Sequence, residues 1–224
     1  MDSLVYRSAT AINAAMGRVY LYMFYAIAAS FVTAGLVTST PALMAFFFTG
    51  IMKWITIFAP LVFILVLSFG IEKLNKQQAI LALGGFAVVW GISMAAVFAV
   101  YTLGSIVSAF MGAGILFAVM SFYGYFTKKD LTSLGQFMFI GLIAIVIASI
   151  VNIFIGSSIG AMVISALAII IFLGLTAYDT QNIRNMVSYD TGDGKNEVLG
   201  ALSLYMNFIN IFVALLQLFG TKED

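Results

Sequence analysis

Residues 135–178 read GQFMFIGLIAIVIASIVNIFI-GS-SIGAMVISALAIIIFLGLTAY and contain no Asp, Glu, Lys or Arg. A helix that crosses the hydrocarbon core of a bilayer needs about 20 apolar residues, so this run is too long for one crossing and long enough for two. Gly156 and Ser157, at its middle, are small residues that favour a turn. The stretch therefore predicts two antiparallel membrane helices, Gly135–Ile155 and Ser158–Tyr178, joined by a very short loop.

The same pattern extends over the rest of the chain. Charged or turn-forming residues separate seven apolar runs, which are Val19–Val37, Trp54–Ile71, Ala79–Val100, Ser105–Phe126, Gly135–Ile155, Ser158–Tyr178 and Leu199–Phe219. We predict an all-α, polytopic membrane protein with seven transmembrane helices in one domain (19–219), a segment 1–18 before it and a short tail 220–224 after it. The stretch Thr38–Lys53 has too few apolar residues after Pro41 to cross, so we expect an interfacial segment or an N-terminal extension of the second helix.

Composition supports a lipid environment and excludes several functions. Of the 224 residues, 63% are hydrophobic and 8% are charged, whereas soluble domains have about 45–50% apolar and about 25% charged residues. The net charge of +1 gives no field that could hold nucleic acid. Because the chain has no Cys and no His, thiol chemistry, imidazole ligands and histidine-based pH sensing are excluded. No cofactor is expected.

The basic residues predict the orientation. With the N-terminus in the cytoplasm, eight of the ten Lys and Arg residues lie inside and two, Lys53 and Lys222, lie outside, which satisfies the positive-inside rule. The first 18 residues lack the apolar core of a signal peptide, so no cleaved leader is expected. We predict a multi-pass protein of the cell (plasma or inner) membrane.

Asp179 is the acid that this scheme places inside the membrane. It closes the sixth predicted span, and no Pro or Gly after Gly174 prevents the helix from continuing to Met186. An acid at such depth costs about 2.5–3.5 kcal/mol, so it marks a functional site more often than a structural one. Pairing with Arg184, Lys73 or Lys76, or extension to the interface, are the structural alternatives.

The seventh predicted span carries a polar stripe. Its members recur at spacings of four and three residues, on one face of a helix: Ser203, Asn207, Asn210, Ala214 and Gln217. Asn207 and Asp179 lie at similar predicted depths on antiparallel neighbouring helices, so the two side chains can meet. For Ser203, Asn210 and Gln217, packing between helices and lining of a polar path are both open. Within the polar connection Thr180–Val198, the run Asp190–Glu197 is expected to be a solvated loop.

Three stretches resemble the transmembrane Bax inhibitor motif family, in its bacterial branch. They are TKKDLTSLG (127–135), YDTQ (178–181) and LSLYMNFINIF (202–212). The resemblance implies a pH-sensitive calcium leak controlled by two buried aspartates on the last two helices, which share a proton and seal the pore. Asp179 matches the first aspartate, and Asn207 stands where the second is expected.

This departure changes the chemistry that the resemblance implies. Two carboxylates in contact repel each other, so their pKa values separate. An Asp–Asn pair has no such repulsion. We therefore expect this protein to respond to pH differently from relatives with two aspartates. One carboxylate also makes Asp179 only a weak calcium ligand.

The leading hypothesis is a cation path gated around Asp179 and Asn207, with Lys73 or Arg184 as counter-ion and calcium as the transported species. The partners expected are then the lipid bilayer and cations. The resemblance also implies an alternative, a non-transporting regulator that engages a membrane-anchored protease. An enzyme is not expected, because a Ser–His protease needs His and an aspartyl intramembrane protease needs a second acid on a Gly-x-Gly-Asp turn, which is missing.

Overall fold

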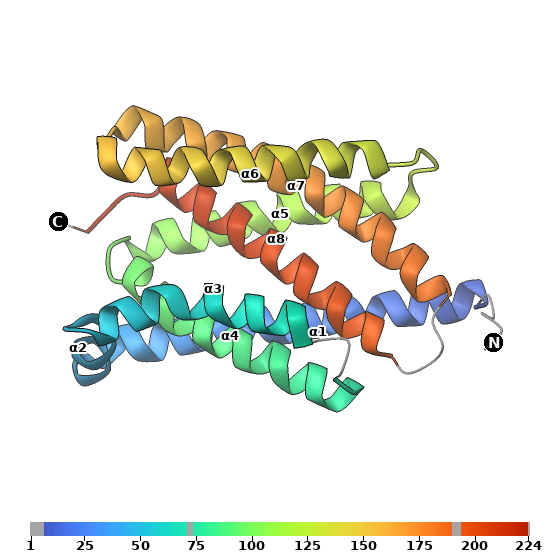
Figure 1. Ribbon diagram of the computed structural model, residues 1–224, viewed down its shortest axis with the longest axis horizontal. Coiled ribbons are helices and arrows are strands. Elements are labelled where there is room, and N and C mark those ends of the chain that lie inside the picture. Colours follow the sequence, from blue (N-terminus) through green and yellow to red (C-terminus); the bar gives the residue numbers. More distant parts are fainter. Residues whose placement is uncertain (1–6, 71–73, 190–193, 224) are drawn as a thin grey trace. The chain divides into compact units, whose positions relative to one another are not determined.

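The computed structural model describes residues 7–70, 74–189 and 194–223, and every helix or strand found in them is an α-helix. The prediction of an all-α fold is confirmed. The elements, labelled in Figure 1, are α1 (Ala9–Ser39), α2 (Pro41–Phe48), α3 (Met52–Gly70), α4 (Lys76–Phe98), α5 (Leu103–Phe126), α6 (Thr132–Ile155), α7 (Ser158–Ser188) and α8 (Lys195–Phe219).

Six helices are long and apolar enough to cross a membrane, and a seventh span results if α2 and α3 are taken together. These two helices are bent by 78° at a break of three residues, 49–51. The stretch before the second span is thus a separate helix and not an extension of α3. Lys53 lies in the first turn of α3, and Thr56 of α3 donates a hydrogen bond of 3.0 Å to the carbonyl of Phe47 on α2.

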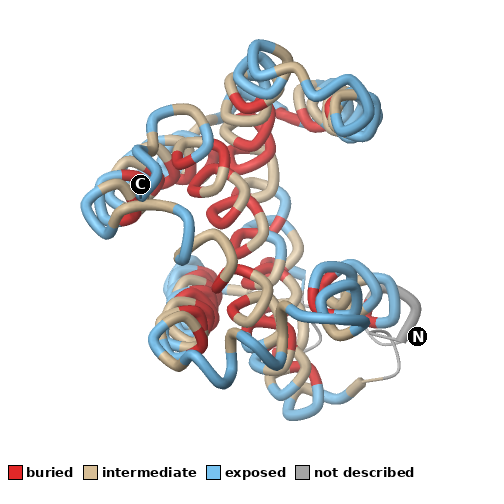
Figure 2. The backbone as a smooth tube through the Cα atoms, turned by 90° about the vertical axis from the view of Figure 1, so that its left-hand side faces the viewer, coloured by how far each residue is buried: buried red, intermediate tan, exposed pale blue. Residues whose placement is uncertain are grey.

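The helices fall into two compact units, which we describe separately. The first unit contains α1 to α4 and α8 as far as Tyr205, and the second contains α5, α6, α7 as far as Met186, and α8 from Met206. Figure 2 shows exposed residues along all of the helices, and many of them are large and apolar, as expected of surfaces that face lipid.

In the first unit, α1 packs closely on α4. A Cβ atom at Gly91 of α4 would lie 2.5 Å from the carbonyl oxygen of Ser30 on α1, so only glycine allows this approach. The hydroxyl of Ser30 lies 2.8 Å from the carbonyl of Ala87 and 2.7 Å from the hydroxyl of Tyr205 on α8. Tyr205 is fully buried, so one serine joins three helices.

In the second unit, small residues bring α7 close to its neighbours. A Cβ atom at Gly124 of α5 would overlap the carbonyl of Ala177, and one at Gly135 of α6 would lie 2.5 Å from the ring of Tyr178. Gly156 ends α6 in the left-handed region, at φ 69°. The predicted two-residue connection to α7 is confirmed, and α6 and α7 run side by side (Figure 1).

Two helices are longer than the apolar runs that predicted them. The continuation of α7 past Asp179 is confirmed, because the helix ends at Ser188. Helix α8 begins at Lys195 and not at Leu199, so Glu197 lies in its first turn and is 1% exposed. The prediction that the run up to Glu197 is a solvated loop is therefore wrong for its last part. Residues 190–193 of that run lie outside the described residues.

Candidate functional site: a carboxylate and an amide on the last two helices

Asp179 of α7 and Asn207 of α8 are in direct contact within the second unit. The side-chain amide of Asn207 donates a hydrogen bond of 2.7 Å to Oδ2 of Asp179. Asn207 is 4% exposed and Asp179 is half-buried. The carboxylate thus has a neutral donor as its partner, so the hydrogen bond leaves its negative charge uncompensated.

Their positions follow from the lengths of the two helices. Asp179 lies nine residues before the end of α7, and Asn207 lies twelve residues after the start of α8. A rise of 1.5 Å per residue places them about 14 Å and about 18 Å from those helix ends. Asp179 therefore lies where the apolar run of α7 ends, followed by about two and a half turns of more polar helix, and Asn207 lies near the middle of α8.

Buried hydroxyl groups lie beside the aspartate. Thr176 and Thr180, one on either side of Asp179 in the sequence of α7, are fully buried, and Ser121 of α5 is 4% exposed. The hydroxyl of Thr180 donates to the carbonyl of Thr176 at 2.7 Å and lies 3.0 Å from the hydroxyl of Ser121. Sequence reasoning missed these three residues, because single hydroxyls in apolar helices are common and carry no charge signal.

The rest of the polar stripe on α8 has varied surroundings. Asn210 donates to the carbonyl of Met206, one turn earlier, at 2.8 Å. Gln217 accepts a hydrogen bond of 3.1 Å from Ser165 of α7. Ser203 is exposed and lies in the first unit. The structure therefore joins Asn207 and Gln217 to α7, whereas Asn210 bonds within its own helix.

The contacts of two basic residues considered as partners of Asp179, Arg184 and Lys76, are described by the structure. The guanidinium group of Arg184 donates to the carbonyl of Tyr125 at 3.0 Å and lies 4.8 Å from the centre of the Tyr125 ring. Lys73 lies outside the described residues. Lys76 has Glu197 as a partner, at 3.4 Å, within the first unit. Arg184 therefore contacts α5 through Tyr125.

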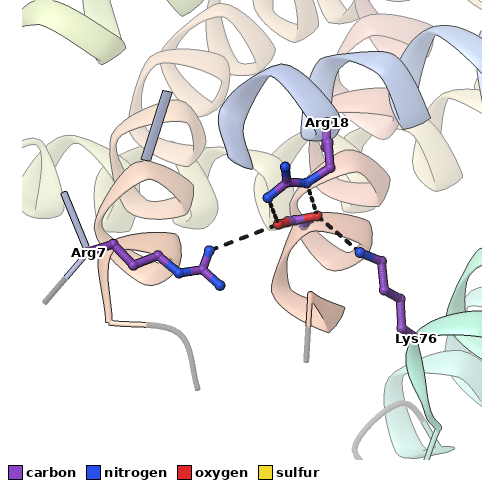
Figure 3. Close-up of polar contacts among 4 residues, drawn as sticks. Arg7, Arg18 and Lys76 are labelled. Atoms are coloured by element: carbon purple, nitrogen blue, oxygen red, sulfur yellow. Dashed lines mark hydrogen bonds and ion pairs between the residues drawn. The ribbon is translucent and has the colours of Figure 1, made fainter. Parts of the chain in front are cut away.

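The first unit contains a second cluster of charges, shown in Figure 3. Three basic side chains converge on the carboxylate of Glu197: Arg18 at 2.6 Å, Lys76 at 3.4 Å and Arg7 at 4.0 Å. Arg18 forms two hydrogen bonds with it, one to each oxygen. This carboxylate is fully compensated, in contrast to Asp179, so its arrangement indicates a structural tie between α1, α4 and α8.

The described residues contain no group of three or more acidic, His or Cys side chains that could hold a metal ion. Calcium in a storage site takes six to eight oxygen ligands. A cation at Asp179 would have one carboxylate, with hydroxyl, carbonyl or amide oxygens and water as its other ligands. Such a site suits brief contact during passage better than tight retention.

The apolar helices define the class of protein, a multi-pass helical membrane protein. A family model described as Inhibitor of apoptosis-promoting Bax1 matches residues 12–224. The chain belongs to this Bax inhibitor-1-like family.

Relatives match over nearly the whole chain. The inner membrane protein YbhL of Escherichia coli is 37% identical over 214 residues, which are 93% of this chain and 92% of YbhL. A protein of Rickettsia prowazekii is 35% identical over 212 residues, covering 93% of this chain and 90% of that protein. A protein of Caulobacter vibrioides is 38% identical over 172 residues, covering 75% and 68% of the two chains. The similarity therefore includes all the membrane helices and both units.

Proposed function

We propose that this protein is a cation leak whose conducting path passes Asp179 and Asn207, with calcium as the cation and pH as a modulator. The observation that carries the proposal is the 2.7 Å hydrogen bond from the buried amide of Asn207 on α8 to the half-buried carboxylate of Asp179 on α7. The family resemblance supports calcium as the transported species.

The charge balance at Asp179 supports a cation as ligand. An uncompensated carboxylate in a low-dielectric environment is costly, and a passing cation relieves that cost. Asn207 fixes one oxygen, Oδ2, and thereby orients the group. The buried hydroxyls of Thr180 and Ser121 add polar atoms to this part of the second unit.

Gating follows from the same contact. The hydrogen bond between Asn207 and Asp179 joins α7 to α8, and it must loosen if a cation is to take the place of the amide donor. An Asp–Asn pair lacks the repulsion that makes two aspartates share a proton. The pH profile of flux should therefore differ from that of a variant in which two carboxylates meet.

Calcium entry into proteoliposomes that contain a calcium-sensitive dye tests the proposal. The variants are Asp179→Ala, Asp179→Asn and Asn207→Asp, and the control is Asp130→Asn, which removes an exposed acid of the loop between α5 and α6. We expect flux to vanish in both Asp179 variants and to persist in the control. Flux that is unchanged in Asp179→Ala would overturn the proposal.

The pH arm compares the wild type with Asn207→Asp between pH 5 and pH 8. We expect different profiles, because the substitution creates a pair of carboxylates. Identical profiles would contradict the role of Asn207. Absence of flux under every condition, together with a membrane-anchored protease that co-purifies with the chain, would favour the alternative of a non-transporting regulator.

A further inference from the structure

The first unit contains an apolar groove between α3 and α4. Its chemistry differs from that of the polar pair described above. Its volume is about 670 Å³. The α3 side is one face of that helix, at spacings of three and four residues from Ile55 to Leu67, and the opposite side includes Ala82 and Val89 of α4. Every lining side chain is apolar. The small side chains of Ala59 and Ala82 leave the space open.

Hydrocarbon is the occupant that fits this groove. The thirteen residues from Ile55 to Leu67 rise by about 18 Å, close to half the roughly 30 Å thickness of the hydrocarbon core, which is the reach of an acyl chain in one leaflet. A flexible hydrocarbon chain can follow the uneven apolar walls of the groove, because every lining side chain is apolar.

At one end of the groove, the charged side chain of a lysine lies over the ring of a tryptophan. Trp54, which is 59% exposed, stacks on Phe58 of the groove wall, with ring centroids 6.4 Å apart. The Nζ atom of Lys53 lies 5.9 Å from the centre of the Trp54 ring. Tryptophan and lysine in this arrangement are typical of the level of lipid headgroups.

The charge of this lysine has no acidic neighbour in the surrounding sequence. No Asp or Glu occurs between Ser3 and Ile71, which covers α1, α2 and α3, and Lys53 is exposed. An anionic headgroup supplies the missing negative charge. We propose that the groove binds one acyl chain of an acidic phospholipid, whose phosphate is held by Lys53 beside Trp54.

Native mass spectrometry of the detergent-solubilised full chain tests this site with phosphatidylglycerol and phosphatidylcholine of identical acyl chains. The wild type should retain one phosphatidylglycerol in preference to phosphatidylcholine. Lys53→Gln should reduce that preference about fivefold, the effect of one basic residue near an anionic surface. Lys222→Gln, the same change at another exposed lysine, should leave the preference unchanged.

The groove itself is tested by Ala82→Phe, with Ala148→Phe on an exposed face of α6 as the matched control. We expect Ala82→Phe to lose retention of both lipids and the control to keep it. Equal retention of the two lipids by the wild type, or unchanged retention in Ala82→Phe, would overturn the proposal.

A second measurement keeps the proposal testable if Ala82→Phe does not fold. In a Trp90→Phe background, phosphatidylglycerol with brominated acyl chains should quench the fluorescence of Trp54 more strongly in the parent than after Lys53→Gln. Equal quenching in the two would contradict the site. None of these readouts depends on cation flux, so the lipid site and the proposed function can fail separately.

Discussion

Arg18 on α1 holds Glu197 on α8 through two hydrogen bonds, 2.8 Å from Nε to Oε2 and 2.6 Å from Nη2 to Oε1. The two residues are 179 positions apart in the chain. Because the carboxylate is 1% exposed, its charge depends on these donors and on the nearby lysine. Bidentate geometry makes this the strongest kind of ion pair available to a protein.

Loss of this pair should lower stability. Arg18→Gln leaves a buried carboxylate with weaker partners, which costs about 2 kcal/mol, below the usual value for a buried pair because Arg18 is 44% exposed and Lys76 remains. The thermal midpoint in detergent should fall by about 4–8 °C. The thermal midpoint of Arg18→Lys should fall by less, because lysine keeps the positive charge but lacks the planar guanidinium group that donates two parallel hydrogen bonds. The exposed Lys128→Gln serves as control, and an equal fall in it would contradict the explanation.

The hydroxyl pair of Ser30 and Tyr205 predicts an asymmetric response. Ser30→Ala leaves the buried hydroxyl of Tyr205 without this partner and should cost about 1–3 kcal/mol. Tyr205→Phe removes the tyrosine hydroxyl, so no buried polar group is left without a partner. Ser30 keeps a backbone carbonyl as acceptor, and this change should cost about 0.6 kcal/mol. Denaturant or thermal unfolding of both variants measures the difference. If Tyr205→Phe proves the more harmful change, the explanation is wrong, because this variant keeps the ring and loses only the hydroxyl that bonds Ser30.

Two glycines of α5 offer a matched pair. A methyl group at Gly124 would overlap the backbone of Ala177, which lies two residues before Asp179, whereas Gly114 has no atom within 4 Å of the added Cβ. Gly124→Ala should cost about 1–3 kcal/mol and reduce calcium flux. Gly114→Ala should keep both at the wild-type level or raise stability slightly. Thermal unfolding and the flux assay, run in parallel, test this, and similar behaviour of the two variants would argue against tight packing of α5 on α7.

The loop before α6 contains an aspartate whose pKa is lowered by hydrogen bonds. The direction in which its contribution to stability changes with pH is therefore defined. Hydrogen bonds from the hydroxyl and the backbone amide of Thr132, at 2.6 and 2.9 Å, lower the pKa of Asp130 below its ordinary value of 3.8. The stabilisation from these bonds is therefore present above that value and is lost as the pH falls through the lowered pKa. Carbon-13 NMR of the carboxyl group should give a midpoint below 3.8, and Thr132→Val should raise it. Thr127→Val, in the same loop, should not.

Much of the fold could be predicted because bilayer thickness imposes a length on every apolar run. Gly156 and Ser157 marked the connection between α6 and α7, and the run up to Met186 indicated that α7 continues past Asp179. The depth of Asp179 and the spacing of Asn207 also indicated that the two could meet. These inferences use only helix periodicity and the cost of charge in lipid.

What could not be predicted depends on contacts between distant segments. Glu197 follows an acidic, glycine-containing stretch and has the local sequence of a loop, yet three basic groups from elsewhere in the first unit bury it in α8. Arg184 follows Asp179 by five residues, which is not the spacing of neighbouring side chains on a helix, and it lies against the ring of Tyr125. The 78° bend between α2 and α3 could not be predicted either, since Pro41 signals the start of α2 but not its direction.

The two-residue connection between Ile155 and Ser158 also constrains how this protein is made. A linker this short cannot leave one helix in the membrane while the other waits in water, and neither helix carries a charge between residues 135 and 178 that could hold it back. We therefore expect α6 and α7 to insert as one helical hairpin during biosynthesis, and Asp179 to reach the bilayer before α8 delivers Asn207.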